Sequence, residues 1–315
     1  MPYREVLGPG AALPPHGSER WAVRTGNFTR HLENRSAVRS ELKRWTPMKP
    51  LLVGEPGGER FRLPTDVEDP GIRRAAARAA RRYFASLALM LVLASAPLIV
   101  LNAWFGVLHE SLWLALGWLT LAGLFYLEAR ASFARPHHLR ERAAFFYWLR
   151  TLSPARTGSL TFALVLAAMT AVQRFAMAAS DGLAGAFHCY GLLHPRVVEG
   201  EAWRLLTGPF LHYSVEHFLL NAVLVTTLGA LAWAFYDWGA LLIFTVGCVF
   251  SMAAQMLLGG QVHDNAAGVS GGAYALGALV LAAAWRRSGT LPPGLAPQLL
   301  GLIAIGILGS ELSSP

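Results

Sequence analysis

Residues 201–221 read EAWRLLTGPFLHYSVEHFLLN, and they open an apolar run that extends from Leu205 to Ala232. A run of this length predicts a helix that crosses a bilayer. It carries His212, His217 and Asn221, and polar groups inside a bilayer are costly enough that they usually mark function. His217 and Asn221 are four residues apart, so their side chains share one face of a helix. The run therefore predicts a membrane helix that presents an imidazole and an amide together.

A serine lies near the start of a second apolar run, between Gly268 and Gly271. We expect this run to form a helix from Gly268 to Trp285, with Ser270 two residues inside it. The flanking glycines would leave room beside the hydroxyl for a substrate backbone. Gly271 would also let another helix approach closely, as small residues do in membranes.

These three side chains together predict acyl-transfer chemistry within the membrane. His217 and Asn221 can both donate hydrogen bonds to an oxygen. With the backbone N–H of Ser270, they would surround the oxyanion that forms when a serine attacks a carbonyl group. The alternative is that His217 and Asn221 only join packed helices, and the Gly-Val-Ser-Gly sequence favours the catalytic interpretation.

The composition indicates a membrane protein that crosses the bilayer several times. Of its 315 residues, 54% are hydrophobic and 15% are charged, and the mean hydropathy is +0.40. Soluble domains carry roughly a quarter charged residues. Cys189 lies in a predicted loop and Cys248 lies deep in an apolar run, so we expect neither a disulfide nor a zinc site. The sequence implies no metal and no organic cofactor.

The predicted fold class is an all-α polytopic membrane protein with about seven transmembrane helices. The first 82 residues are polar and Arg-rich, without the early apolar core of a cleavable signal peptide. The seven apolar runs are Tyr83–Leu108, Ser111–Leu127, Ser159–Ser180, Leu205–Ala232, Gly239–Gly260, Gly268–Trp285 and Leu295–Gly309.

The basic residues predict how these helices are oriented. The first 82 residues hold 16 of the 27 Lys and Arg, and most of the others lie in two short spacers. A cytoplasmic N-terminus with seven crossings places 24 of the 27 on the cytoplasmic side. This distribution fits the positive-inside rule better than it fits nucleic-acid binding. Ser270 and His212 would then lie at similar depth near the outer face, within reach of external water.

The motifs resemble, in order and spacing, the signature of the rhomboid family of intramembrane serine proteases. They are Glu201-Ala-Trp203-Arg204, His212-x4-His217-x3-Asn221, and Gly268-Val-Ser270-Gly271 with Tyr274. The resemblance implies that Ser270 is the nucleophile and that His217 and Asn221 donate to the oxyanion. It further implies that Tyr274 packs against the catalytic imidazole. The residues that support the motif without a chemical role would be Trp203, Arg204, His212, Gly268 and Gly271.

The resemblance covers about residues 159–309 and implies a rhomboid-like helical bundle with five of the family's six core helices. The expected organisation is a cytoplasmic basic extension (1–82), two additional transmembrane helices (83–130), a basic interfacial linker (131–158) and the core (159–315). The implied substrates are transmembrane proteins, cut near the outer membrane boundary. The implied surroundings are membrane lipid, without nucleic acid, in a bacterial inner membrane.

The sequence departs from the family at the general base. Rhomboids pair the serine with a histidine of the sixth core helix, in an Ala-His-x-x-Gly setting, whereas all ten histidines here precede Ser270. We expect His263 to be solvated and His212 to be structural, so that the base is absent from this chain. The favoured explanation is a C-terminally truncated protease sequence. The alternative is a catalytically inactive rhomboid-like protein that binds membrane helices without cutting them, and a transporter fits less well because few ionisable groups lie deep in the runs.

Overall fold

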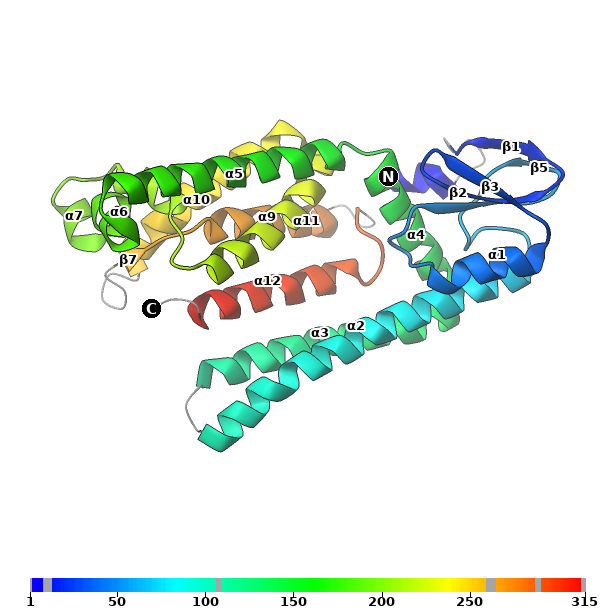
Figure 1. Ribbon diagram of the computed structural model, residues 1–315, viewed down its shortest axis with the longest axis horizontal. Coiled ribbons are helices and arrows are strands. Elements are labelled where there is room, and N and C mark those ends of the chain that lie inside the picture. Colours follow the sequence, from blue (N-terminus) through cyan, green and yellow to red (C-terminus); the bar gives the residue numbers. More distant parts are fainter. Residues whose placement is uncertain (1, 8–12, 106–108, 259–264, 287–289, 313–315) are drawn as a thin grey trace. The chain divides into compact units, whose positions relative to one another are not determined.

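The computed structural model describes residues 2–7, 13–105, 109–258, 265–286 and 290–312. These residues are mainly helical, which confirms the predicted class of helical membrane protein (Figure 1). The chain forms two compact units. The first comprises Met1–Ser153 with Ala284–Gly301, and the second comprises Pro154–Ala283 with Leu302–Pro315.

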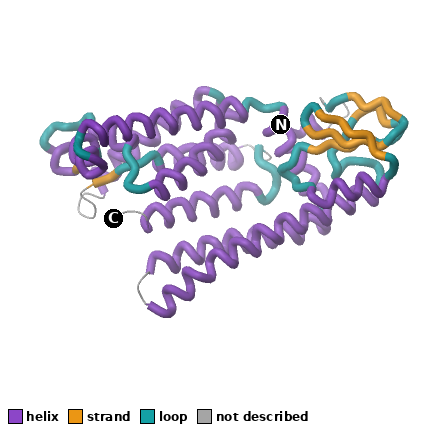
Figure 2. Tube along the Cα trace, in the orientation of Figure 1, coloured by secondary structure: helices purple, strands orange, loops and turns teal. Residues whose placement is uncertain are grey.

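The first unit opens with a small β-rich domain, in a segment whose structure the sequence analysis left undecided (Figure 2). In the antiparallel sheet β2 lies between β3 and β4, while β1 pairs with β5. Gly26 and Asn27 form the turn from β2 to β3, and Gly26 has a positive φ of 60°, as two-residue hairpin turns require. The strands are β1 (Pro15–Ser18), β2 (Trp21–Thr25), β3 (Phe28–Leu32), β4 (Leu51–Gly54) and β5 (Gly58–Arg60).

A short helix and two single turns accompany these strands. Helix α1 (Arg35–Glu41) begins after Asn34, whose side chain accepts a hydrogen bond from the backbone N–H of Ala37 at 3.0 Å. The 3-10 turns are η1 (Pro2–Leu7) and η2 (Leu42–Arg44). Trp45, which is 1% exposed, lies in the core of this domain. A packed interior of this kind shows that the N-terminal segment is a small domain rather than a tail.

Three helices form the rest of the first unit up to Ser153: α2 (Pro70–Phe105), α3 (His109–Ala134) and α4 (Pro136–Thr151). α2 begins 13 residues before the expected start at Tyr83. The intervening residues are mostly Ala and Arg, which favour helix, and proline suits the first helical turn. α4 lies in the expected interfacial linker and buries one face in the protein, where its Phe145 ring meets Tyr3 edge-on at 5.5 Å.

The second unit contains four of the predicted apolar helices in whole or in large part, together with a structured loop. The long helices are α5 (Ala155–Ala179), α9 (Val215–Tyr236), α10 (Trp238–Leu258) and α11 (Ser270–Arg286). The last helix, α12 (Leu295–Leu312), and α11 have residues in both units. The loop between α5 and α9 holds α6 (Gly182–Tyr190), β6 (Leu192–Leu193), α7 (His194–Val198), α8 (Arg204–Thr207) and η3 (Gly208–Phe210).

Four helices are long and apolar enough to cross a membrane, counted over the described residues. They are Pro70–Val100, Ala155–Ala179, His217–Tyr236 and Trp238–Leu257, and Leu295–Ile307 is a shorter apolar helix. Each of the seven predicted runs coincides with a helix, although the number of seven crossings stays a prediction. Large apolar side chains such as Leu93 and Leu242 are more than 60% exposed on these helices, as expected for surfaces that face lipid.

Two further predicted helix starts are wrong, and both errors concern site residues. α9 begins at Val215 and not at Leu205, because the chain turns at Gly208 and Pro209 and Ser214 then caps the helix by accepting the His217 N–H at 3.2 Å. His212 therefore lies in the loop before α9. α11 begins at Ser270 and not at Gly268, since Gly268 has a φ of +101° that a helix cannot contain.

Candidate functional site

Helix α9 presents His217 and Asn221 from successive turns, and the two side chains are only 3% and 2% exposed. His217 Nδ1 and Asn221 Nδ2 are buried and have no hydrogen-bond partner among the described residues. A buried polar group without a partner costs about 1–3 kcal/mol. Two such groups one turn apart indicate a place where an oxygen atom from a ligand would be held.

Gly268 brings the loop before α11 against this pair. A Cβ atom built on Gly268 would lie 3.1 Å from His217 Cε1, 3.2 Å from His217 Nε2 and 3.4 Å from Asn221 Nδ2. A Cβ atom at these distances would be tight, because His217 or Asn221 would have to move by a few tenths of an ångström, and the positive φ also favours glycine. The half-buried Ser270 follows two residues later as the first residue of α11. The motifs on α9 and before α11 thus meet, although His217 and Gly268 lie 51 positions apart in the sequence.

Backbone pairing holds the loop in this position. β6 pairs with β7 (Asn265–Ala266), which places Leu193 opposite Asn265 and Leu192 opposite Ala266. The backbone N–H of Gly268 also donates to the Gly208 carbonyl at 3.4 Å. The loop between α5 and α9 therefore supports the segment that leads to Ser270.

Aromatic rings pack behind the imidazole of His217. The Tyr213 ring stacks on the His217 ring, with 5.9 Å between the ring centres, and on the Phe187 ring at 4.7 Å. The centre of the His212 ring lies 5.5 Å from that of His217. Burial, with a smaller contribution from His217, lowers the pKa of His212 to about 4, so this ring is neutral near pH 7. Burial raises the pKa of Tyr213 to about 12. A neutral, rigid surround of this kind fixes His217 without placing a charge beside it.

Comparison with known protein families assigns this part of the chain. Residues 199–314 match the family model of the rhomboid domain. The chain carries a domain of the rhomboid family. No curated protein and no solved structure matched the chain. The match includes every site residue named above on α9 and α11, and the predicted start of the domain at residue 159 stays untested.

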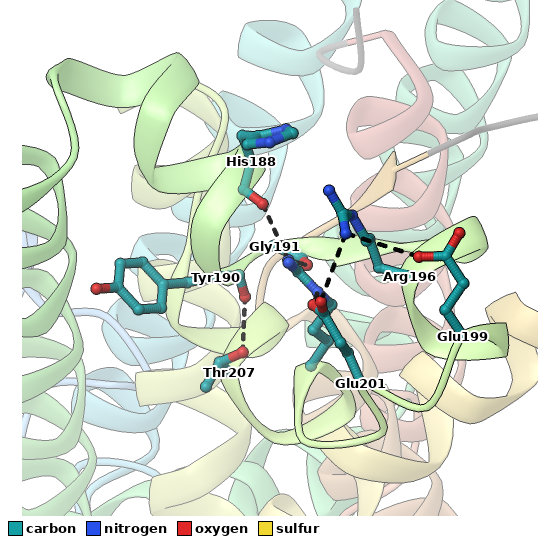
Figure 3. A network of polar contacts seen from close by, with 8 residues as sticks. His188, Tyr190, Gly191, Arg196, Glu199, Glu201 and Thr207 are labelled. Carbon is teal, nitrogen blue, oxygen red and sulfur yellow. Dashed lines mark hydrogen bonds and ion pairs between the residues drawn. The ribbon is translucent and has the colours of Figure 1, made fainter.

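Within the rhomboid domain, Arg204 organises the loop that precedes α9 through its contacts with His188, Gly191 and Glu201, which Figure 3 labels. Arg204 is only 4% exposed. Its guanidinium donates hydrogen bonds to Glu201 Oε2 at 2.5 Å, to the His188 carbonyl at 3.1 Å and to the Gly191 carbonyl at 2.8 Å. It also lies over the Trp203 ring at 4.7 Å. Arg204 therefore joins the end of α6 to α8, and Trp203 contacts its guanidinium, while the predicted supporting role of the two residues in the motif stays a prediction.

Gly271 does not leave room for a substrate, contrary to one of its two predicted roles. A Cβ atom there would lie 2.0 Å from Ser251 Oγ and 2.9 Å from the Gly247 carbonyl oxygen, both on α10. The space beside Gly271 is thus filled by α10, and close helix packing is its role in the structure. Gly247 and Ser251 are small residues four apart on α10, a spacing in the sequence that indicated this contact.

The structure relates the remaining predicted residues less closely to the contact between Gly268 and α9. Tyr274 lies one turn after Ser270 on α11 and is partly buried, and its predicted packing against a catalytic imidazole stays a prediction. His212, weighed as a substitute base, has its ring packed on His217 and edge-on to Phe218 at 5.2 Å, which fits a structural role. His263, the other substitute, lies outside the described residues.

Proposed function

We propose that this chain is an intramembrane serine endopeptidase of rhomboid type. Its rhomboid domain supports membership of a family of such proteases and their inactive homologues. The single observation that favours catalysis is the contact of Gly268 with His217 and Asn221, whose buried donors lack partners among the described residues. Ser270 follows this contact at the start of α11.

In the proposed reaction Ser270 Oγ attacks a carbonyl carbon of a transmembrane substrate. Its proton passes to an imidazole base, which the experiment below adds, and the carbonyl oxygen becomes an oxyanion that accepts hydrogen bonds from His217, Asn221 and the Ser270 N–H. Each such donor contributes about 3 kcal/mol to transition-state stabilisation. Collapse of this intermediate expels the amine, which takes the proton from the imidazolium, and leaves an acyl-serine ester, which water then hydrolyses to regenerate the hydroxyl.

The position of Ser270 at the first residue of α11 supports this role. The first N–H groups of a helix have no partner within it, and the helix dipole places partial positive charge there. Both features stabilise an anion that forms beside the residue. We further propose that the substrates are single-pass membrane proteins cut near the outer boundary, in a bacterial inner membrane with the N-terminal domain in the cytoplasm, as the basic residues suggest.

A second function is supported by a different observation, namely that among the described residues no base forms a hydrogen bond with the Ser270 hydroxyl. A serine hydroxyl is a weak nucleophile unless a base accepts its proton. An inactive homologue would use the same buried donors of His217 and Asn221 to bind an unwound membrane helix through its backbone carbonyl without cutting it.

One experiment separates the two functions. Purified protein in liposomes is incubated with a model single-pass substrate that has small, helix-breaking residues near its outer end, and cleavage is followed with and without imidazole as an added base. Protease function predicts cleavage, or imidazole-dependent cleavage, that Ser270→Ala abolishes and that His217→Ala lowers at least about 100-fold. A Ser251→Ala variant serves as the control for a nearby hydroxyl outside the proposed chemistry.

The inactive function predicts no cleavage by any variant and photo-crosslinking to the substrate that Ser270→Ala leaves unchanged. Cleavage that persists in Ser270→Ala would contradict the serine mechanism. Labelling of Ser270 by a fluorophosphonate probe gives an independent measure of its nucleophilicity.

A further inference from the structure

A basic pocket lies in the first unit, on the part of the chain that precedes the rhomboid domain. Its volume is 480 Å³, and five cationic side chains and one aromatic ring line it: Arg39, Lys43, Arg78, Arg81, Arg82 and Phe133. These residues come from α1, η2, α2 and α3. The concentration of positive charge at a pocket of this size indicates a small anionic ligand.

One lining cation, Arg39, has a carboxylate nearby, because Asp69 lies 3.9 Å from it, and the other acidic residues near the pocket pair with cations outside it. α2 contains no Asp or Glu at all over its 36 residues. On the neighbouring segments Asp69 pairs with Arg35 at 2.6 Å, Glu41 pairs with Arg30, and Glu128 pairs with Arg142 at 3.4 Å. Among the described residues no carboxylate forms an ion pair with Lys43, Arg78, Arg81 or Arg82. The pocket therefore keeps an uncompensated positive charge.

The pocket is also built rather than being only a row of surface charges. Arg82 donates to the backbone carbonyl of Lys43 at 3.2 Å, which joins α2 to η2. The Arg81 guanidinium lies 5.8 Å from the centre of the Phe133 ring, which joins α2 to α3. These contacts fix two guanidinium groups at the wall of the pocket, where planar forks suit a phosphate.

Its position along α2 is where the helix changes from polar to apolar. Arg81 and Arg82 end the basic stretch, and the next exposed large side chains are Leu89, Met90 and Leu93, at 59%, 57% and 62%. The apolar run begins at Tyr83, directly after Arg82, so the arginines of the pocket lie at the edge of the expected hydrocarbon region, next to the layer of phospholipid headgroups.

We infer that this pocket binds the phosphate of an anionic phospholipid in the leaflet next to the N-terminal domain. The exposed Phe133 ring and the apolar surface of α3 at Leu127, which is 60% exposed, would contact the glycerol and the first acyl carbons. A free phosphate ion would share the arginine contacts but not this apolar wall. The inference concerns the first unit and does not depend on the proposed protease activity.

The test is native mass spectrometry of the delipidated full chain, titrated with phosphatidylglycerol and with phosphatidylcholine of the same acyl chains. The test variant is Arg78→Gln with Arg81→Gln. The matched control is Arg130→Gln with Arg135→Gln, since these exposed arginines flank Phe133 on α3 and at its end, at the same depth but outside the pocket lining. Removing two guanidinium groups from the pocket should weaken phosphatidylglycerol binding about 100-fold, from roughly tenfold for each charge-assisted hydrogen bond to the phosphate that is lost.

The control pair should change phosphatidylglycerol binding less than about threefold, because its charges act only through the general field. An equal loss of phosphatidylglycerol affinity in the two double variants would show that surface charge alone explains the binding, and it would contradict a specific site in the pocket. Displacement of the lipid by inorganic phosphate at comparable concentration would assign the site to a free anion instead. Equal affinity for phosphatidylcholine would also contradict the inference, and thermal melting of each variant verifies that all are folded.

Discussion

At the scale of single residues, Gly268 decides whether the site can form. Its positive φ and its contacts with His217 and Asn221 are separate constraints, and both disfavour a Cβ atom at this position. The sequence could suggest only that a glycine beside Ser270 leaves space. The structure shows which side chains use that space, because those side chains reach it from α9.

Gly268→Ala should therefore lower both the cleavage rate and the melting temperature, since His217 or Asn221 must shift by a few tenths of an ångström to admit the new methyl group. Gly200→Ala is the matched control, because Gly200 has a similar φ of +111° with nothing within 4 Å of the added Cβ. Backbone strain alone costs about 1 kcal/mol in each variant. Equal losses of stability and activity in the two variants would show that strain, and not the contact, explains the effect.

Because the pKa of the buried His212 is lowered, we expect the folded protein to lose stability in acid. Its pKa is about 4 in the folded protein and 6.5 in an exposed reference state, so the unfolded chain takes up a proton that the folded chain excludes. The contribution of neutral His212 to the free energy of unfolding is complete above pH 6.5. It falls by about 3 kcal/mol in total as the pH decreases toward 4. Thermal melting in detergent between pH 7 and pH 4 should show this decrease. His212→Gln cannot titrate, so its melting temperature should fall less over this interval, and parallel curves would contradict the assignment.

At the scale of elements, the loop from α6 to α8 depends on one buried cation. Arg204 connects Glu201 with two backbone carbonyls, whereas Arg196 reaches Glu199 and Glu201 only at 3.6 and 3.8 Å from an exposed position (Figure 3). Buried partners left unpaired are costly, while exposed ion pairs contribute little.

Arg204→Gln should destabilise this loop by about 2–3 kcal/mol. Hydrogen exchange should rise across residues 182–207 and spread to the segment that β6 pairs with. Arg196→Gln is the control and should change stability by about 0.5 kcal/mol or less. Unchanged exchange in Arg204→Gln would mean that backbone packing alone holds the loop.

At the scale of the whole molecule, the chain leaves the first unit at Ser153 and returns to it at Ala284. Arg142 holds the returning segment, because it donates to Gln298 at 2.9 Å and pairs with Glu128 at 3.4 Å while its own side chain is 2% exposed. A buried charge pair that loses one partner leaves the other charge uncompensated.

Arg142→Gln should destabilise the first unit by about 3–5 kcal/mol and increase hydrogen exchange in residues 290–301. Arg140→Gln on the same helix removes an exposed pair with Asp66 and should cost about 1 kcal/mol or less. Exchange in α9 should not change in either variant, since α9 belongs wholly to the second unit. Equal effects of the two substitutions would contradict the structural role of Arg142.

Much of this protein follows from local sequence. Apolar runs such as Trp238–Leu258 exclude charge over the length of a bilayer and cannot be stable as anything but helix in lipid. The spacing of His217 and Asn221 determines that they share a helical face, because 3.6 residues complete a turn. The N-terminal strands escaped prediction because short strands show weak alternation and gain most of their stability from pairing with distant partners such as β4.

Only the tertiary structure decided what the glycines and the buried charges do. Gly268 and Gly271 look alike in sequence, yet one contacts the polar pair on α9 and the other packs on α10. The difference arises because Gly268, with its positive φ, lies in the turn before α11, whereas Gly271 already lies within the helix. Contacts between residues far apart in sequence depend on packing, and no local pattern contains that information.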